Sequence, residues 1–170
     1  MLDKRGAVLE TARRISSLMR ANNVPGAIIG GVAVVLHGHL RTTKDVDVWI
    51  DQPLASFRPL LESLGTEFDR NKREFLLDSV PVHLVDQEMV RPAPQHTVVI
   101  DEITTVSLPD LINMKLRSGL ANITRAQDIA DVIGLIRHQK LNSAFVSKID
   151  KPLRAEFRKL VAAVKRERGA

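Results

Sequence analysis

Apolar positions near the start of the chain recur at the spacing of one helical face. Val8, Ala12, Ile15 and Met19 are three or four residues apart, which predicts an amphipathic helix over about 4–22. Short apolar or alternating runs follow between turn-forming residues, and such runs are typical of strands. The expected strands are 26–29, 45–50, 66–70, 74–77, 80–85 and 97–100.

Helical stretches separate and follow these runs. A helix is expected over 30–37, and another from Pro53 to about Leu64, where Gly65 stops it. Beyond the strand that ends at residue 100, the pattern indicates helices only. The concentration of strands in the first part and of helices in the second predicts the α/β class, with a helical part after the strands.

Length and composition place this arrangement in one domain. A chain of 170 residues can bury a sizeable core, here an α/β core over about 1–106 followed by a helical C-terminal part over about 107–170. No apolar run reaches the length of a membrane span, and the N-terminus lacks the apolar centre of a signal peptide. The absence of cysteine fits a reducing compartment and excludes disulfides and thiolate sites. We therefore expect a cytoplasmic protein without membrane attachment.

The basic charge of the chain is concentrated at its C-terminal end. The formal net charge is +5, and residues 151–170 hold seven Lys and Arg against Glu156 and Glu167. Apolar positions from Leu153 to Val164 recur at helical spacing, which predicts an amphipathic helix with a cationic outer face. That face is either simply solvated or follows the phosphates of RNA. Low aromatic content, with one Trp and no Tyr, argues against base stacking.

Two acidic residues and two glycines carry the candidate chemistry. Asp45 and Asp47 alternate with valines on an expected strand, so both carboxylates lie on one face, where they can hold Mg²⁺. Gly30 and Gly31 end an apolar run and open a helix, so backbone N–H groups can approach a triphosphate. Either motif alone is weak, because Asp-x-Asp arises by chance and Gly-Gly is common in turns. Their order, with thirteen residues between the motifs, favours a joint metal and phosphate site.

The stretch 29–50 resembles the DNA-polymerase-β-type nucleotidyltransferase superfamily. The pattern of that superfamily is Gly-Gly or Gly-Ser, a spacer of this length, and then acid, hydrophobic, acid, hydrophobic. Arg41 and Thr43 also match the Arg-x-Thr-x-Asp-x-Asp form of a small bacterial branch that includes abortive-infection, type IV toxin-like nucleotidyltransferases. Residues 108–115 and 125–131 are similar to the Leu-x-x-Leu-x-x-x-Lys and Arg-x-x-Asp-x-x-Asp helices of that branch.

The resemblance implies a nucleotidyltransferase-like mixed β-sheet flanked by helices, and it suggests roles for several residues. Asp45 and Asp47 would hold Mg²⁺ or Mn²⁺, with a nucleoside triphosphate as the substrate. Lys115 would neutralise the triphosphate and stabilise the departing pyrophosphate, unless it is an ordinary exposed helix lysine. The residues implied to bind the nucleotide are Gly30, Gly31, Arg41, Thr43 and Asp128, the last of which would also orient Lys115.

The chain departs from the superfamily pattern at the third carboxylate. That acid usually lies on a strand beside the Asp-x-Asp strand, and the matching position here holds His83. His83 falls on the face opposite Val82 and Leu84, so its side chain can point toward the aspartates. It can act as a general base for the acceptor hydroxyl, Asp86 can supply the missing acid, or His83 can have no catalytic role. The change weakens the expectation of two-metal catalysis, since Mg²⁺ prefers oxygen ligands.

Other polar residues have simpler interpretations. Arg125 and Asp131 can form surface ion pairs with helical neighbours. His37 and His39 have a spacing that suggests zinc, but Gly38 between them indicates a helix end, so a zinc site is the less favoured interpretation.

The sequence supports two functions. The first is an enzyme in which an acceptor hydroxyl attacks the α-phosphorus of a nucleoside triphosphate and pyrophosphate leaves. The acceptor is an RNA 3′ end, a protein hydroxyl or a small molecule such as an aminoglycoside. The second is a degenerate nucleotidyltransferase fold that binds nucleotide or RNA without turnover, and His83 is the residue that divides the two. Membership of a toxin–antitoxin system, with an antitoxin partner, is compatible with either.

Overall fold

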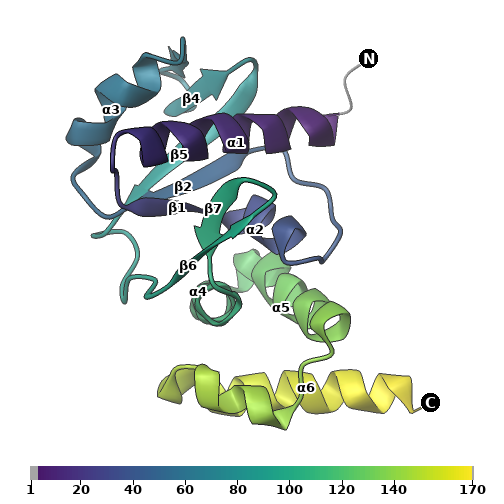
Figure 1. Ribbon diagram of the computed structural model, residues 1–170. Coiled ribbons are helices and arrows are strands. Elements are labelled where there is room, and N and C mark those ends of the chain that lie inside the picture. Colours follow the sequence, from purple (N-terminus) through teal and green to yellow (C-terminus); the bar gives the residue numbers. More distant parts are fainter. Residues whose placement is uncertain (1–3, 170) are drawn as a thin grey trace.

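The computed structural model describes residues 4–169, which form a seven-stranded sheet and its flanking helices (Figure 1). Positions 1–3 and 170 of the expected domain lie outside the described residues. The strands are β1 (Gly26–Ile29), β2 (Val46–Ile50), β3 (Glu67–Asp69), β4 (Glu74–Leu77), β5 (Val80–Asp86), β6 (Thr97–Ile100) and β7 (Ile103–Val106). The α-helices are α1 (Lys4–Ala21), α2 (Gly30–Leu36), α3 (Leu54–Glu62), α4 (Leu108–Ala121), α5 (Ala126–Gln139) and α6 (Arg154–Arg168). The 3₁₀ turns are η1 (Ile123–Arg125), η2 (Ser143–Lys148) and η3 (Lys151–Leu153).

The sheet is mixed, and β2 lies at its centre. The strand order is β3-β4-β5-β2-β1-β7-β6. Strand β2 runs antiparallel to β1 and parallel to β5, and β1 runs parallel to β7. The expected α/β class, a mixed sheet flanked by helices and followed by C-terminal helices, is therefore confirmed.

The two faces of the sheet bury alternate side chains of the same strands. Ile28 of β1 and Val48 of β2 pack in one apolar cluster with α1, which crosses that face in Figure 1. Ala27 and Trp49, their chain neighbours, belong to a second cluster with Leu111 of α4. Successive side chains of a strand point to opposite faces, so the central strands contribute to both clusters. The sheet is consequently a middle layer between two apolar clusters, and packing on both faces fixes the positions of β1 and β2.

Helix α6 packs on the other helices through an apolar stripe. Phe157 is fully buried and shares a cluster with Leu135 of α5. In Figure 1, α6 lies beyond α4 and α5, on the side away from the sheet. The expected C-terminal amphipathic helix thus exists, and it begins at Arg154 because the preceding residues form the turn η3. Within the described residues, no helix combines the length and the apolarity that a membrane crossing needs.

Strand β7 corrects the expectation of helices only beyond residue 100. Residues Ile103–Val106 pair antiparallel with β6. The connection consists of Asp101 and Glu102, whose φ values are 50° and 66°, and positive φ at both central residues is typical of a tight two-residue hairpin. The dipeptide Asp-Glu lacks the Gly that usually takes the second central position of such a turn, so the turn signal in the sequence is weak.

Candidate functional site

The two aspartates lie at the start of β2. The strand begins at Val46, so Asp45 immediately precedes it and Asp47 is its second residue. Val46 and Val48 are fully buried, whereas the side chains of Asp45 and Asp47 are 41% and 27% exposed. The alternation of a strand thus directs the valines into the core and leaves both carboxylates accessible.

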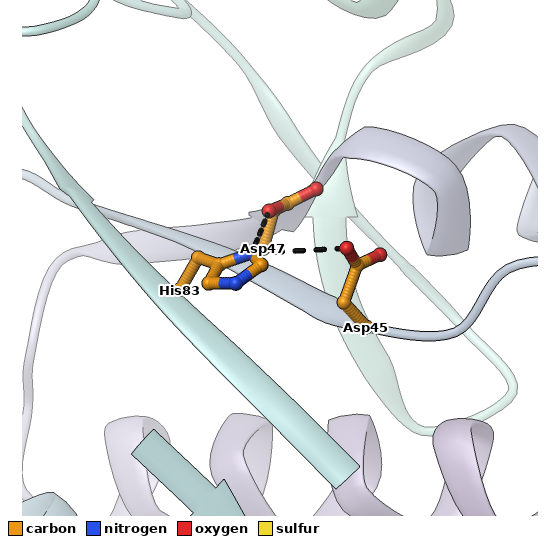
Figure 2. A group of neighbouring side chains, drawn as sticks. All are labelled: Asp45, Asp47 and His83. Atoms are coloured by element: carbon orange, nitrogen blue, oxygen red, sulfur yellow. Dashed lines mark hydrogen bonds and ion pairs between the residues drawn. The ribbon is translucent and has the colours of Figure 1, made fainter. Parts of the chain in front are cut away.

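His83 joins the aspartates from the neighbouring strand β5. The two strands are parallel, and Asp47 lies opposite His83 in their register. Nδ1 of His83 is 3.2 Å from Oδ1 of Asp47 and 3.8 Å from Oδ2 of Asp45 (Figure 2). One ligand atom from each residue lies within 4.8 Å of the other two. We call Asp45, Asp47 and His83 the Asp-His cluster.

Glu74, the first residue of β4, is a fourth ionisable group that the sequence analysis missed. It is buried, and its Oε2 lies 3.0 Å from Nε2 of His83. Strand β4 pairs antiparallel with β5, with Phe75 opposite Val82, and this pairing brings Glu74 beside His83. No sequence signal marks Glu74, because the contact depends on a pairing between strands and on no local motif.

The surroundings raise the pKa values of both Asp47 and His83. Burial raises the pKa of Asp47, and the charge of Asp45 raises it further. Burial by itself lowers the pKa of His83, but the hydrogen bonds to Glu74 and Asp47 outweigh it and raise the pKa overall. A crowded group of carboxylates favours the binding of positive charge, whether a proton or a metal ion.

Gly30 and Gly31 allow the main chain to approach the aspartates and the loop before β2. Gly30 has φ +66°, and a Cβ added there would lie 2.0 Å from Oδ2 of Asp47. A Cβ on Gly31 would lie 2.5 Å from Oγ1 of Thr43 and 2.9 Å from Nη2 of Arg41. Both glycines therefore make room for side chains of this chain.

Lys115 of α4 lies in an ion-pair network with α5. Its Nζ is 2.7 Å from Oδ1 of Asp128 and 2.9 Å from Oδ2 of Asp131. Asp131 also pairs with Nε of Arg41 at 2.7 Å, and Asp128 accepts a hydrogen bond from Nε of Arg125 at 2.9 Å. The structure thus brings Lys115 and Asp128 together. The surface interpretation of Asp131 is wrong, because its side chain is fully buried between cationic partners.

The network also stabilises the charged form of Asp128. Burial by itself raises the pKa of this carboxyl, but hydrogen bonds from Lys115 and Ser118 outweigh the effect and lower the pKa. An ionised Asp128 in turn holds the ammonium of Lys115 in one place, as a buried charge requires a charged or hydrogen-bonding partner.

A cavity of about 520 Å³ opens beside the Asp-His cluster, a volume in the range of small-molecule sites. Its cationic lining residues are Arg91, Lys115, Arg117 and Arg125. Its apolar lining residues are Ile29, Val85, Met89, Val90, Leu111 and Met114, and the wall is completed by Gly30, Asp47, Ser118 and Asp128. The combination of cationic and apolar surface suits an anionic organic molecule.

The residues that the resemblance implied for nucleotide binding fall into two groups. Gly30 and Asp128 line the cavity. Gly31, at the start of α2, instead lies beside Arg41 and Thr43 of the loop before β2. These three residues are not among those that line the cavity.

Two other candidates lie away from the cluster. Asp86 accepts hydrogen bonds from two backbone N–H groups of the turn that follows β5, so it stabilises that turn. His37 is buried, with Nε2 2.8 Å from the carbonyl oxygen of Val106. Among the described residues, His37 and His39 do not belong to a group that could hold a metal ion.

A mixed sheet with an Asp-x-Asp strand at its centre is the arrangement expected of the nucleotidyltransferase class. The chain belongs to the family described as nucleotidyltransferase of unknown function (DUF6036), whose profile matches residues 7–155. This membership agrees with the superfamily resemblance carried by the Gly-Gly and Asp-x-Asp motifs. No curated protein matches the chain in sequence.

Solved structures share the fold at low sequence identity. An antigenic nucleotidyltransferase-like protein from Paracoccidioides brasiliensis is 18% identical with a TM-score of 0.61, over 94% of this chain and 88% of that one. The antibiotic-resistance factor ANT(2″)-Ia in solution is 17% identical with a TM-score of 0.59, over 98% and 99% of the two chains. ANT(2″)-Ia in complex with adenylyl-2″-tobramycin is 17% identical with a TM-score of 0.57, over 84% and 92%. At these identities the likeness establishes the fold.

Proposed function

We propose that the protein transfers a nucleoside monophosphate from a nucleoside triphosphate to a hydroxyl acceptor. The acceptor oxygen bonds to the α-phosphorus, the bond from that phosphorus to the bridging oxygen of the β-phosphate breaks, and pyrophosphate leaves while the hydroxyl proton passes to solvent. Family membership supports this class of reaction. The observation that carries the proposal is the position of Asp47, which belongs to the Asp-His cluster and also lines the cavity.

The donor set of the cluster fits a divalent cation. Mg²⁺ and Mn²⁺ both take carboxylate ligands, and Asp45 and Asp47 offer oxygens close enough to share one ion. When bound, such an ion would neutralise phosphate charge and orient the α-phosphorus. Burial and the proximity of Asp45 both raise the pKa of Asp47, so positive charge at this point relieves an existing electrostatic strain.

Cationic residues of the cavity wall are suited to the phosphates. Lys115 is held by Asp128 and Asp131, so its ammonium acts from a fixed position. Arg125 has a side chain that is 59% exposed and can adjust to a ligand. A cation that is already fixed in place does not have to move before it stabilises the charge that develops on a leaving group. We assign this role toward pyrophosphate to Lys115. Arg125 would bind the outer phosphates.

Label transfer tests the reaction and identifies the acceptor. The protein is incubated with each α-labelled nucleoside triphosphate, Mg²⁺ or Mn²⁺, and one acceptor class at a time: total RNA, total protein or aminoglycosides. The last class is included because one structure of similar fold contains adenylyl-2″-tobramycin. We expect label to enter one class and to depend on the metal.

The double variant Asp45→Asn with Asp47→Asn tests the site. It should lose both the transfer and the increase in nucleotide affinity that the metal causes, because both coordinating charges are removed. Asp51→Asn is the matched control, since Asp51 is exposed just beyond the end of β2. Nucleotide binding that is independent of metal and equal in wild type and double variant would contradict the site assignment.

A nucleotide-binding module without turnover is the second candidate. It is favoured by His83, which stands opposite Asp47 where the superfamily pattern has a third acid. Metal-dependent nucleotide binding with no transfer to any acceptor class would support this function.

A further inference from the structure

We propose that His83 is a ligand of the divalent ion through Nδ1, that Glu74 is the positioning residue which orients its ring, and that the site consequently prefers a transition ion such as Mn²⁺ to Mg²⁺. The inference rests on the proposed function, because it concerns the ion that Asp45 and Asp47 are assigned to hold. It goes further in assigning a third ligand, a supporting carboxylate and the class of metal.

The first argument is the direction of the two ring nitrogens. Nδ1 of His83 faces the aspartates, at 3.2 Å from Asp47 and 3.8 Å from Asp45, and Figure 2 shows the ring turned toward both carboxylates. The parallel register of β2 and β5 fixes this arrangement, because it places His83 directly opposite Asp47. Two carboxylate oxygens and one imidazole nitrogen therefore lie within 4.8 Å of one another.

The second argument is the partner of the other nitrogen. Nε2 of His83 lies 3.0 Å from Oε2 of Glu74, whose side chain is 10% exposed. A carboxylate that accepts the Nε2–H bond leaves the Nδ1 lone pair free for an ion. Metal-bound histidines usually have such a carboxylate or carbonyl partner, which fixes the tautomer and raises the basicity of the ligand nitrogen. Glu74 has the position and the burial that this task requires.

Lys72 also lies near Glu74, but it does not account for the burial of that carboxylate. Nζ of Lys72 is 3.7 Å from Oε1 of Glu74, but the Lys72 side chain is 70% exposed and its charge is screened by solvent. A buried carboxylate needs a closer partner, and His83 supplies it. The Glu74 carboxylate thus holds the imidazole of His83 in one orientation.

The preference for a transition ion follows from the ligand chemistry. Mg²⁺ is bound almost entirely by oxygen, whereas first-row transition ions also accept imidazole nitrogen, and Mn²⁺ does so while keeping the carboxylate ligands that it shares with Mg²⁺. A site with His83 in place of a carboxylate also carries one negative charge fewer, and this weakens its attraction for any divalent ion. A transition ion offsets part of that loss through its bond to the imidazole nitrogen, whereas Mg²⁺ does not.

Spectroscopy of the bound ion tests the ligand directly. Mn²⁺ is added to the protein without nucleotide, and electron spin echo spectroscopy records the coupling of the electron spin to nearby nitrogen. We expect the coupling of one imidazole nitrogen in wild type and its loss in His83→Ala. A bound Mn²⁺ without nitrogen coupling in wild type would overturn the inference, and so would coupling that persists in His83→Ala.

Metal affinities test selectivity. Free Mn²⁺ is titrated by electron paramagnetic resonance, and Mg²⁺ is measured by its competition. Wild type should bind Mn²⁺ more tightly than Mg²⁺, and His83→Asp should shift the preference toward Mg²⁺. His96→Asp is the control, because the His96 side chain is 81% exposed outside the cluster. Equal selectivity in wild type and His83→Asp would show that His83 is no ligand.

Glu74 is tested through the same affinities. Removal of a carboxylate behind a metal-bound histidine typically costs about 10- to 100-fold in affinity, so Glu74→Gln should weaken Mn²⁺ binding by that order and Mg²⁺ binding far less. Glu74→Asp, which keeps the charge, should recover part of the loss. Glu67→Gln on the exposed edge strand β3 is the control. If Glu74→Gln weakens both ions equally, Glu74 has a general structural role and the positioning role is overturned.

The Asp45→Asn and Asp47→Asn double variant separates the inference from the proposed function. Loss of both ions in that variant, with unchanged Mn²⁺ binding in His83→Ala, would overturn the imidazole ligand and leave the proposed function standing. Retention of Mn²⁺ binding in the double variant would overturn both. A wild-type protein that binds neither ion would also overturn both.

Discussion

Asp131 has a fully buried carboxylate that lies 2.9 Å from Nζ of Lys115. The same ammonium is 2.7 Å from Asp128, so one lysine of α4 compensates two carboxylates of α5. Buried charges remain in a protein interior only where such partners offset the loss of hydration. These ion pairs join α4 to α5. Because Lys115 also lines the cavity, the packing of the two helices fixes the position of its ammonium at the proposed phosphate site.

Lys115→Met should therefore destabilise the protein even in the absence of any ligand. Removing one partner of a buried ion pair costs about 3–5 kcal/mol, and the loss should fall at the lower end here because Asp131 and Asp128 keep Arg41 and Arg125 as cationic partners. Urea unfolding measures the loss. Lys159→Met is the control, since Lys159 pairs with Glu156 on the exposed side of α6 and such pairs contribute about 1 kcal/mol or less. Equal free energies of unfolding for the two variants would contradict the structural importance of Lys115.

Gly30→Ala should reduce metal affinity, whereas Gly65→Ala should not. Both glycines have positive φ, so alanine strains the backbone at either position. A Cβ at position 30 would also lie 2.0 Å from a carboxylate oxygen of Asp47 and must displace it, while a Cβ at position 65 meets no atom within 4 Å. Thermal unfolding of the two variants reports the backbone strain that both share, and their Mn²⁺ affinity reports the displacement of Asp47 that only Gly30→Ala causes. Unchanged metal affinity in Gly30→Ala would show that Asp47 does not hold the ion.

Spacing in the sequence predicted which residues of β1, α2 and β2 would come together, because strand alternation and helix starts are local properties. Asp45 and Asp47 could be placed on one face from their alternation with Val46 and Val48 alone. His83 could be placed beside them by the resemblance, and the register of β2 with β5 puts it opposite Asp47.

Contacts that depend on pairing between distant segments could not be predicted. Glu74 reaches His83 through the pairing of β4 with β5, and no sequence motif contains both residues. Asp131 is buried because Arg41, ninety positions earlier, packs against it, which a helical spacing pattern does not reveal. Strand β7 was missed because its turn is formed by a dipeptide without the usual signal.

Acid should destabilise the protein in part through His37. Burial lowers the pKa of this histidine, although the hydrogen bond to the Val106 carbonyl acts in the opposite direction. Between the folded pKa and the unfolded value of about 6.5, the unfolded chain binds more protons, so stability falls as the pH drops through this window. We expect His37→Gln to lose less stability than wild type between pH 8 and pH 5, as measured by urea unfolding. An identical loss of stability in wild type and His37→Gln would contradict the role of His37.

The cationic face of α6 can be tested without removing the helix. Phe157 is fully buried in the cluster that α6 shares with α5, so deletion of residues 151–170 would expose core surface. Arg158, Lys165 and Arg166 are exposed on the helix, and the first two line a groove of about 460 Å³. Substitution of these three side chains removes charge and keeps the apolar stripe.

The triple variant Arg158→Gln, Lys165→Gln and Arg166→Gln should bind single-stranded RNA more weakly and with a smaller dependence on salt. Each cation that contacts a phosphate releases a condensed counterion and contributes about 0.7 to the slope of log affinity against log salt, so three contacts would lower the slope by about 2. Fluorescence anisotropy at several NaCl concentrations measures it. The control removes the same charge from exposed positions far along the chain, at Arg58, Arg70 and Arg73. A slope that falls equally in the two variants would indicate net charge as the cause, and an unchanged slope in both would leave α6 as a packing helix with a solvated outer face.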